Sequence, residues 1–278
     1  MNKIGRITKY CMVGACCLLV FALKATAQTK DTLALYKQFF SISKNYQQPP
    51  LQASIVFEKS TNYASDARDT STIVAAFYIG KDKSYLRFGE LEQFVEDSLM
   101  LMVSDGLKRM IVMRPTKEQA ARYRMGMGPG LAVPDSSYQD MAKRYRAEGT
   151  ETGDGTGTIQ LFSRQNIRGS SMPKETIELR YNLATKEPVY VTTIQRALIR
   201  LDGATINNND ALAKYRIKLE GSNESFFIKE QVDKYVFKKI EHAPNLPAPV
   251  TIGNRIIRNT QGAFVPVTGF EDYTISEQ

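Results

Sequence analysis

The chain has 278 residues, a formal net charge of +8 and three cysteines, all of them within residues 11–17. Four basic and no acidic residues lie in residues 1–27, so residues 28–278 carry a charge of only +4 and no cysteine. Disulfides, a thiolate nucleophile and a cysteine-based zinc site are thereby excluded for residues 28–278. The length suits one domain whose core is large enough to need no covalent staples.

Residues 1–27 have the three parts of a secretory signal peptide. Basic residues precede an apolar run from Tyr10 to Leu23, and Ala25-Thr26-Ala27 offers a small-x-small cleavage site. The run is shorter than the ~20 apolar residues that span a bilayer, which argues against an uncleaved anchor. We therefore expect an exported protein of the periplasm or outer cell envelope.

A lipidation signal is the alternative reading of the same segment. Val13-Gly14-Ala15-Cys16 resembles a lipobox, in which Cys16 would carry the lipid. Most of the apolar run follows Cys16, whereas a lipobox closes such a run. The sequence therefore favours cleavage after Ala27 over lipidation at Cys16.

A helix is predicted first, over residues 31–46, because Leu35, Phe39 and Ile42 recur on one helical face. Strands and short turns follow, and the Asp105-Gly106 dipeptide is a strong hairpin signal. The first set of predicted strands comprises 53–58, 72–79, 84–88, 91–95, 98–103 and 107–113.

Two further helices are predicted at 116–124 and 135–148, before a second series of strands. These strands are expected at 158–162, 175–181, 189–198, 215–219, 226–229 and 235–240. Short connections favour antiparallel pairing, and the grouping predicts an α+β fold with helices packed against one face of the sheet. We assign residues 28–243 to this domain and residues 244–278 to a proline-spaced linker and C-terminal tail.

The strands at 98–103 and 107–113 are apolar on both faces, unlike an antiparallel strand with water on one side. The expected site residues are Leu99, Met100, Leu101, Met102, Met110, Ile111 and Met113. The predicted helices could cover the second face, or it could line an apolar cavity for an acyl chain, or it could be a protein–protein surface. Methionine suits an adaptable apolar binding surface.

Four segments stand out within this order of elements: Tyr85-Leu86-Arg87-Phe88, Met102-Val103-Ser104-Asp105-Gly106, Met113-Arg114-Pro115 and the later strand Glu175 to Tyr181. With these segments, the order of elements resembles the periplasmic lipoprotein carrier and receptor superfamily (LolA/LolB-like). The resemblance implies a curved antiparallel sheet, an incomplete barrel, closed by helices around an apolar interior for lipoprotein acyl chains.

Common catalytic equipment is not evident in the sequence. His242 is the only histidine, so a multi-histidine metal site is excluded and a catalytic triad would have to use it. Glu90 and Glu92 share a predicted strand face, which indicates a solvated edge rather than a glycosidase pair. We expect no cofactor, no metal and no catalytic residue.

Two segments interleave basic and aromatic residues, Arg122-Tyr123-Arg124 and Lys143-Arg144-Tyr145-Arg146. Export argues against a nucleic-acid partner. Solvated helix faces are the plain interpretation, and contact with an anionic membrane surface is the alternative.

The sequence therefore favours a non-enzymatic envelope protein that binds or carries an apolar or acyl ligand or a lipoprotein. The alternative is a structural or assembly subunit whose tail, residues 250–278, docks on an envelope protein partner. A hydrolase is a third hypothesis, for which no spacing of polar residues gives support.

Overall fold

The computed structural model describes residues 32–45, 48–96, 98–125, 138–200, 213–221, 224–243, 245 and 247–278. The predicted signal peptide, with Cys16, lies outside the described residues.

The first described element is helix α2, Thr32–Asn45, which confirms the helix predicted at 31–46. Leu35, Phe39 and Ile42 are buried, as their spacing requires. Tyr36 is buried beside them, and its hydroxyl donates a 2.7 Å hydrogen bond to the carbonyl oxygen of Tyr145. The helix is thus fixed to the sheet by both packing and a polar contact.

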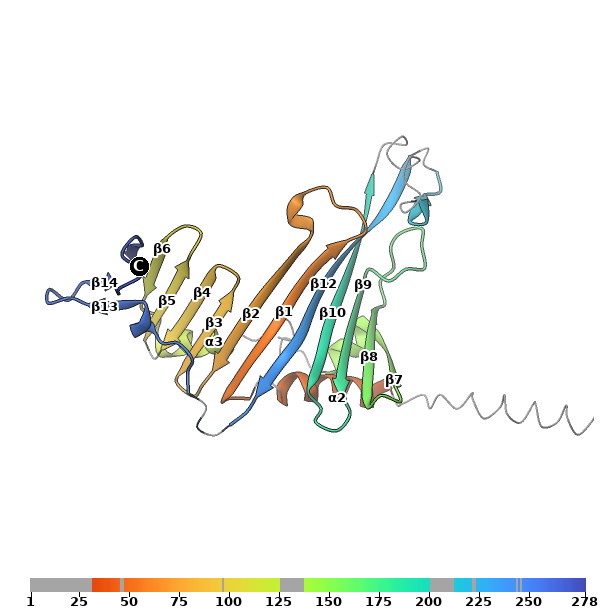
Figure 1. Cartoon of the computed structure of the whole chain (residues 1–278). Helices are drawn as coiled ribbons and strands as arrows, with labels where there is room; N and C mark the ends of the chain where they lie inside the picture. Colours follow the sequence, from red (N-terminus) through yellow and green to blue (C-terminus); the bar gives the residue numbers. More distant parts are fainter. Residues whose placement is uncertain are drawn as a thin grey trace, which may run out of the picture.

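One large sheet dominates the described part of the chain, in the strand order β15-β6-β5-β4-β3-β2-β1-β12-β10-β9-β8-β7, with β11 paired beside β12 (Figure 1). Its strands are β1 Leu51–Thr61, β2 Ser71–Ile79, β3 Lys83–Phe88, β4 Leu91–Glu96, β5 Leu99–Ser104, β6 Arg109–Met113, β7 Tyr145–Glu151, β8 Thr156–Ser163, β9 Glu175–Asn182, β10 Pro188–Arg200, β11 Arg216–Lys218, β12 Ser225–Glu241 and β15 Thr274–Glu277.

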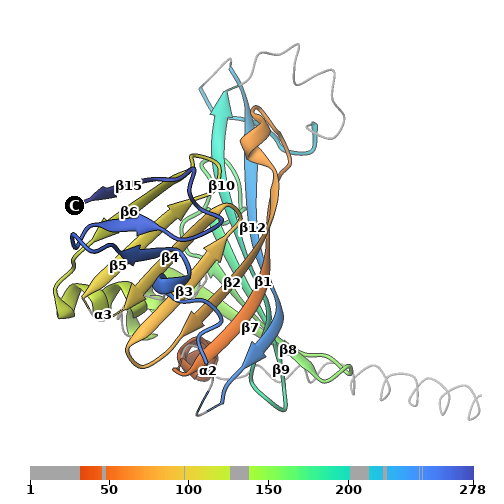
Figure 2. The ribbon, with the colours of Figure 1, turned by 60° about the vertical axis from the view of Figure 1, so that its left-hand side comes forward.

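The sheet is curved, and its end strands β15 and β7 are not neighbours (Figure 2). Neighbouring strands pair antiparallel except β15, which runs parallel to β6. Helices α3, Lys117–Met125, and α4, Tyr138–Arg144, complete the α elements described with α2. The predicted α+β fold, a curved and mainly antiparallel sheet with helices on one face, is confirmed.

Two local predictions were wrong, and one short strand was not predicted. The helix predicted at 135–148 ends at Arg144, because Tyr145 and Ala147 continue as buried, alternate positions of β7. The strands predicted at 226–229 and 235–240 are one long strand, β12. The short strand β13, Ile256–Arg258, which pairs with β14, Phe264–Pro266, was not predicted.

The two faces of the sheet are covered by different parts of the chain. Helices α2 and α4 pack with β1, β2 and β7–β10 over the main core, and α3 places Ala120 against Val95 and Met100 on the same face. We call this the helix-bearing face. The opposite face of β2–β6 carries Tyr78, Tyr85 and Phe94, and residues of the C-terminal segment cover it.

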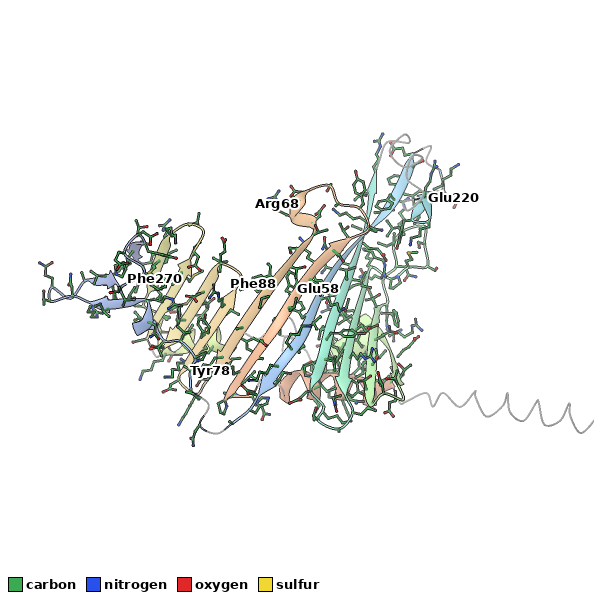
Figure 3. The ribbon with its side chains drawn as sticks, in the orientation of Figure 1. Glu58, Arg68, Tyr78, Phe88, Glu220 and Phe270 are labelled. Atoms are coloured by element: carbon green, nitrogen blue, oxygen red, sulfur yellow. The ribbon has the colours of Figure 1, made fainter. Side chains whose placement is uncertain are left out.

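The C-terminal segment, residues 247–278, folds back on this second face. It contains the 3₁₀ helix η2, Ile252–Asn254, then β13, β14 and β15. Figure 3 labels Phe270 in this segment, beside the end of the sheet formed by β5 and β6. Residues assigned from the sequence to a tail therefore supply part of a hydrophobic core. A second 3₁₀ helix, η1 (Ala67–Asp69), lies between β1 and β2.

Candidate functional site

The hairpin β5–β6 has two apolar faces, as its sequence predicts. Cross-strand pairing places Met100 opposite Met113 and Met102 opposite Ile111 on the helix-bearing face. The same register puts Leu101 opposite Val112 on the other face. The seven predicted site residues therefore divide between two environments.

On the face covered by the C-terminal segment, the hairpin is ordinary core. Leu101 and Met110 are both 0% exposed, and Leu99 packs half-buried against the same cluster. The covering residues come from η2, from β13 and from the position just before β15: Ile252, Ile256 and Tyr273. No room is left beside Leu101 and Met110 that the chain does not itself fill, because both are fully enclosed by protein atoms.

A buried ion pair fastens the C-terminal segment to this face. Arg255 donates to both carboxylate oxygens of Glu92, at 2.6 Å from Nε and 2.9 Å from Nη2. The Tyr85 hydroxyl donates to the same carboxylate at 2.8 Å. The Glu92 side chain is only 2% exposed, so the prediction that Glu90 and Glu92 form a solvated edge was wrong for Glu92.

The charges at this ion pair act on the neighbouring pKa values. Burial makes the largest contribution to the raised pKa of Tyr85, and the hydrogen bond to Glu92 raises this pKa further. The hydrogen bond to Glu92 also raises the pKa of Arg255, so this guanidinium stays charged. Arg255 lies over the ring of Phe270 with 4.7 Å to the centroid, which adds a cation–π contact within the segment.

On the helix-bearing face, the hairpin is only partly covered. Met100 is buried beneath Ala120 of α3, whereas Met102, Ile111 and Met113 are half-buried. The helix accounts for the cover of Met100 but leaves the other three partly accessible. These three are the members of the predicted set that stay partly accessible on the helix-bearing face.

Further half-buried apolar residues extend this surface across the sheet. Leu86 packs against both the α2 and the α3 clusters, and so lies between the two helices. Beyond it, Phe57 contacts Phe88 at 5.6 Å and Tyr235 at 4.9 Å between ring centroids. Figure 3 shows Phe88 near the middle of the sheet. Burial raises the pKa of Tyr235, so its hydroxyl stays protonated at neutral pH.

We call this row the apolar strip, defined by Phe57, Leu86, Phe88, Met102, Ile111, Met113 and Tyr235. It runs over β6, β5, β3, β1 and β12 of the strand order. Sequence reasoning found its methionine end from the missing alternation. It missed Phe57, Phe88 and Tyr235, because pairing of β1 with β12 joins residues far apart in the chain, such as Phe57 and Tyr235.

The described residues give little support to catalysis or metal binding. His242 is exposed just after β12. Among the residues that the structure describes, His, Cys, Asp and Glu form no group of three or more that could hold a metal ion. None of the helices described is both long and apolar enough to cross a membrane.

No family model and no curated protein matches the chain. Solved structures do match it in fold. An outer membrane lipoprotein-sorting protein domain from Vibrio parahaemolyticus has 11% identity and a TM-score of 0.28, covering 78% of this chain and 94% of that one. A LolA superfamily protein from Nitrosomonas europaea has 10% identity and a TM-score of 0.25, covering 80% and 96%.

A DUF1329 family protein from Desulfovibrio piger also matches, with 10% identity and a TM-score of 0.28, covering 78% of this chain and 95% of that one. One of these solved structures, the Nitrosomonas europaea protein, thus belongs to the superfamily that the sequence resembles. TM-scores of 0.25–0.28 are too low for these likenesses to carry an argument about activity. The function is therefore argued from this chain's own residues.

Proposed function

We propose that this chain is a non-enzymatic protein of the cell envelope that binds an acyl chain, free or on a lipoprotein, along the apolar strip. One observation carries the proposal: half-buried apolar side chains of β6, β5, β3, β1 and β12 lie on the helix-bearing face, where Leu86 packs against the clusters of both α2 and α3. Envelope location rests on the signal peptide predicted at residues 1–27.

The dimensions of the strip support an acyl ligand. It crosses from β6 to β12, six strand spacings in the sheet order, and at ~4.8 Å each this is about 30 Å. The acyl chains of one leaflet span about half of a ~30 Å hydrocarbon core. Each methylene that leaves water for this surface contributes about 0.8 kcal/mol, which favours binding of a chain that lies along the strip.

The residue types also suit a ligand of variable structure. Met102 and Met113 are unbranched and adapt their shape, while Phe57 and Phe88 give broad, rigid apolar surfaces. Leu101 and Met110, which belong to the set predicted from the sequence, are left out of the proposed site because the C-terminal segment encloses them.

An assembly role remains the second prediction from the sequence. It was motivated by a tail at 250–278 that could dock on a partner. Much of that tail is engaged on this chain's own sheet, through Ile252, Ile256 and Tyr273. The acyl-binding proposal therefore has the stronger support.

The test is native mass spectrometry with lipid extraction on residues 28–278, purified from its own envelope. A near-stoichiometric acyl-containing species would support the proposal. A protein that arrives without lipid but with another polypeptide would favour the assembly role instead.

The site itself is tested with a matched pair of variants and a fluorescent fatty acid. Met102→Gln combined with Ile111→Gln should weaken binding about tenfold, a loss of ~1.4 kcal/mol. Val74→Gln changes an apolar residue that is 68% exposed on the other face of β2, and should leave the affinity unchanged. Equal affinity of the unchanged protein, the double variant and the Val74 variant for the fatty acid would show that the apolar strip is not the binding site.

A further inference from the structure

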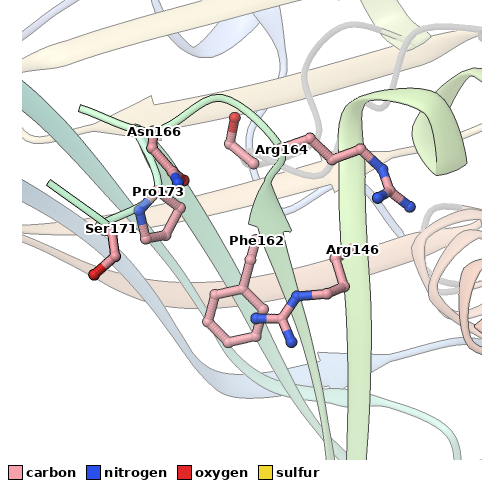
Figure 4. Close-up of a pocket in the computed structure, with 7 residues that line it drawn as sticks. Arg146, Phe162, Arg164, Asn166, Ser171 and Pro173 are labelled. Atoms are coloured by element: carbon pink, nitrogen blue, oxygen red, sulfur yellow. The ribbon is translucent and has the colours of Figure 1, made fainter. Parts of the chain in front are cut away.

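A second surface, at the opposite end of the sheet from the methionine hairpin, has the chemistry of an anion site. Two adjoining hollows, of about 420 and 380 Å³, lie where β8 ends and the chain turns toward β9. Ser163 and Arg164 line both hollows, so the two adjoin at the end of β8. Figure 4 shows the first hollow, with Arg146 extended over the ring of Phe162.

The lining of this basic cleft is dominated by positive charge. The cations are Lys143, Arg144, Arg146, Arg164 and Lys174, while Glu175 is the carboxylate that lines it. Glu175 accepts a hydrogen bond from the Tyr145 hydroxyl. The cations come from the end of α4, from β7 and from both ends of the loop that joins β8 to β9, so the fold gathers them from separate parts of the chain.

Two of these cations are neutralised by the chain. Lys143 pairs with Asp140 at 3.1 Å, and Arg146 pairs with Glu148. Neither is therefore free to give its full charge to a ligand, although both add to the local positive potential.

The other three cations, within the described part of the chain, contact neutral groups rather than carboxylates. Arg144 Nη2 lies 3.2 Å from the Tyr145 hydroxyl, Arg164 Nε donates to the Ala142 carbonyl at 3.1 Å, and Lys174 Nζ reaches Gln165 Oε1 at 3.5 Å. These contacts orient the three side chains without a direct ion pair, so that the hollow holds three such cations and one carboxylate, Glu175. All three are exposed and line the second hollow together.

Backbone contacts hold the three cations in a defined arrangement. The Arg164 amide donates to the Arg144 carbonyl at 2.8 Å, and the Lys174 amide donates to the Gln165 carbonyl at 2.8 Å. A guanidinium has five N–H donors, so Arg164 keeps donors for a ligand after its bond to Ala142. The Arg164 charge also acts on the buried Tyr36 hydroxyl, where it opposes the rise in pKa that burial causes.

We propose that the basic cleft binds a phosphate-bearing anion, held by Arg144, Arg164 and Lys174. A phosphate ester combines several acceptor oxygens with up to two negative charges, which matches three converging cations better than a single carboxylate does. The hollow of about 380 Å³ accommodates the phosphate and its substituent. The phosphate could belong to a lipid headgroup or to a soluble phosphorylated molecule. This inference does not depend on acyl binding at the apolar strip.

The test measures binding of two probes to residues 28–278: glycerol 3-phosphate by calorimetry, and vesicles of phosphatidylglycerol in phosphatidylcholine by cosedimentation. The variant R144Q/R164Q/K174Q should lose about tenfold or more in affinity. The control K81Q/K117Q/K238Q removes the same charge from exposed positions elsewhere and should bind as the unchanged protein does.

Binding of glycerol 3-phosphate would assign a soluble ligand, and binding of vesicles alone would assign a headgroup. Equal losses of affinity in the two triple variants would mean that only net charge matters, and would overturn the proposal. The absence of binding to either probe would overturn it as well. Because Arg164 also contacts α4, the pair R144Q/K174Q, checked for an unchanged melting temperature, must show the same direction of loss. An unchanged affinity in that folded pair would equally contradict the site.

Discussion

Arg255 and Glu92 form a two-pronged ion pair, at 2.6 and 2.9 Å, that joins the C-terminal segment to the buried surface of β4. The two residues are 163 positions apart in the chain. Because the carboxylate is nearly inaccessible to water, its charge must be compensated from within the protein. Arg255 lies nearer to it, at 2.6 Å, than Arg87 does, at 4.0 Å.

Removing one partner of this pair should be costly. Arg255→Leu removes both short hydrogen bonds to the buried Glu92 carboxylate and leaves only the more distant Arg87, at 4.0 Å, as its cation. We expect a loss of about 3 kcal/mol in the free energy of unfolding. Urea denaturation measures it. Arg258→Leu is the matched control, since Arg258 is exposed and lies over Phe264, and its cost should stay below about 1 kcal/mol. Similar costs for both variants would mean that the ion pair does not fasten the segment.

Deletion of residues 250–278 should expose the second face of the sheet. Leu101, Val103 and Met110 would lose their cover of Ile252, Ile256 and Tyr273. Exposed apolar patches of this kind bind hydrophobic dyes and promote association. We expect the shortened protein to bind such a dye and to aggregate, as read by fluorescence and light scattering. A monomer that binds no dye would show that the segment is dispensable for the fold.

Stability should fall at alkaline pH. The pKa of Tyr85 is raised in the folded state, so the unfolded chain loses this proton first as the pH rises. The contribution of Tyr85 is therefore fully present below the unfolded value of about 10 and is lost above it.

Thermal denaturation between about pH 9 and pH 11 measures this effect. Tyr85→Phe should lower stability at neutral pH, because the hydrogen bond to Glu92 is lost, and should reduce the alkaline decline. Tyr123→Phe removes an exposed hydroxyl and serves as the control. An identical decline in both variants would be evidence against the raised pKa of Tyr85.

Gly157 should tolerate no side chain. A Cβ atom there would lie 2.5 Å from the ring of Tyr181, whose hydroxyl is held at 2.6 Å by the Gln38 amide of α2. Gly157→Ala therefore forces Tyr181 to move, at a cost of about 1–3 kcal/mol. Gly153→Ala, where nothing lies within 4 Å, should leave the melting temperature nearly unchanged. Equal melting temperatures of the Gly157 and Gly153 variants would contradict this prediction.

The sequence was informative wherever the signal was local. The apolar stripe of α2 and the doubled apolar faces of the β5–β6 hairpin were both read correctly from spacing. What covers those faces was not readable, because the contact of β13 with the hairpin joins residues such as Ile256 and Met110, which are distant in the chain. Long-range pairing alone also brings Tyr235 beside Phe57.

The segment around residues 143–146 shows a different limit. Its basic and aromatic residues fit a helix face as well as a strand, and the change from α4 to β7 at Tyr145 is set by the core, where Tyr145 and Ala147 are buried. The gathering of Arg164 and Lys174 around Arg144 depends on the return of the chain from β8 to β9, which composition cannot predict.

The most direct test of acyl binding on the helix-bearing face is photolabelling of residues 28–278 with a diazirine-bearing fatty acid, followed by mapping of the labelled peptides. We expect labels on the apolar strip, at Phe57, Phe88, Met102 or Ile111, and we expect unlabelled fatty acid to reduce the labelling. Labels that gather instead around Val74 on the opposite face, or labelling that unlabelled fatty acid does not reduce, would contradict it.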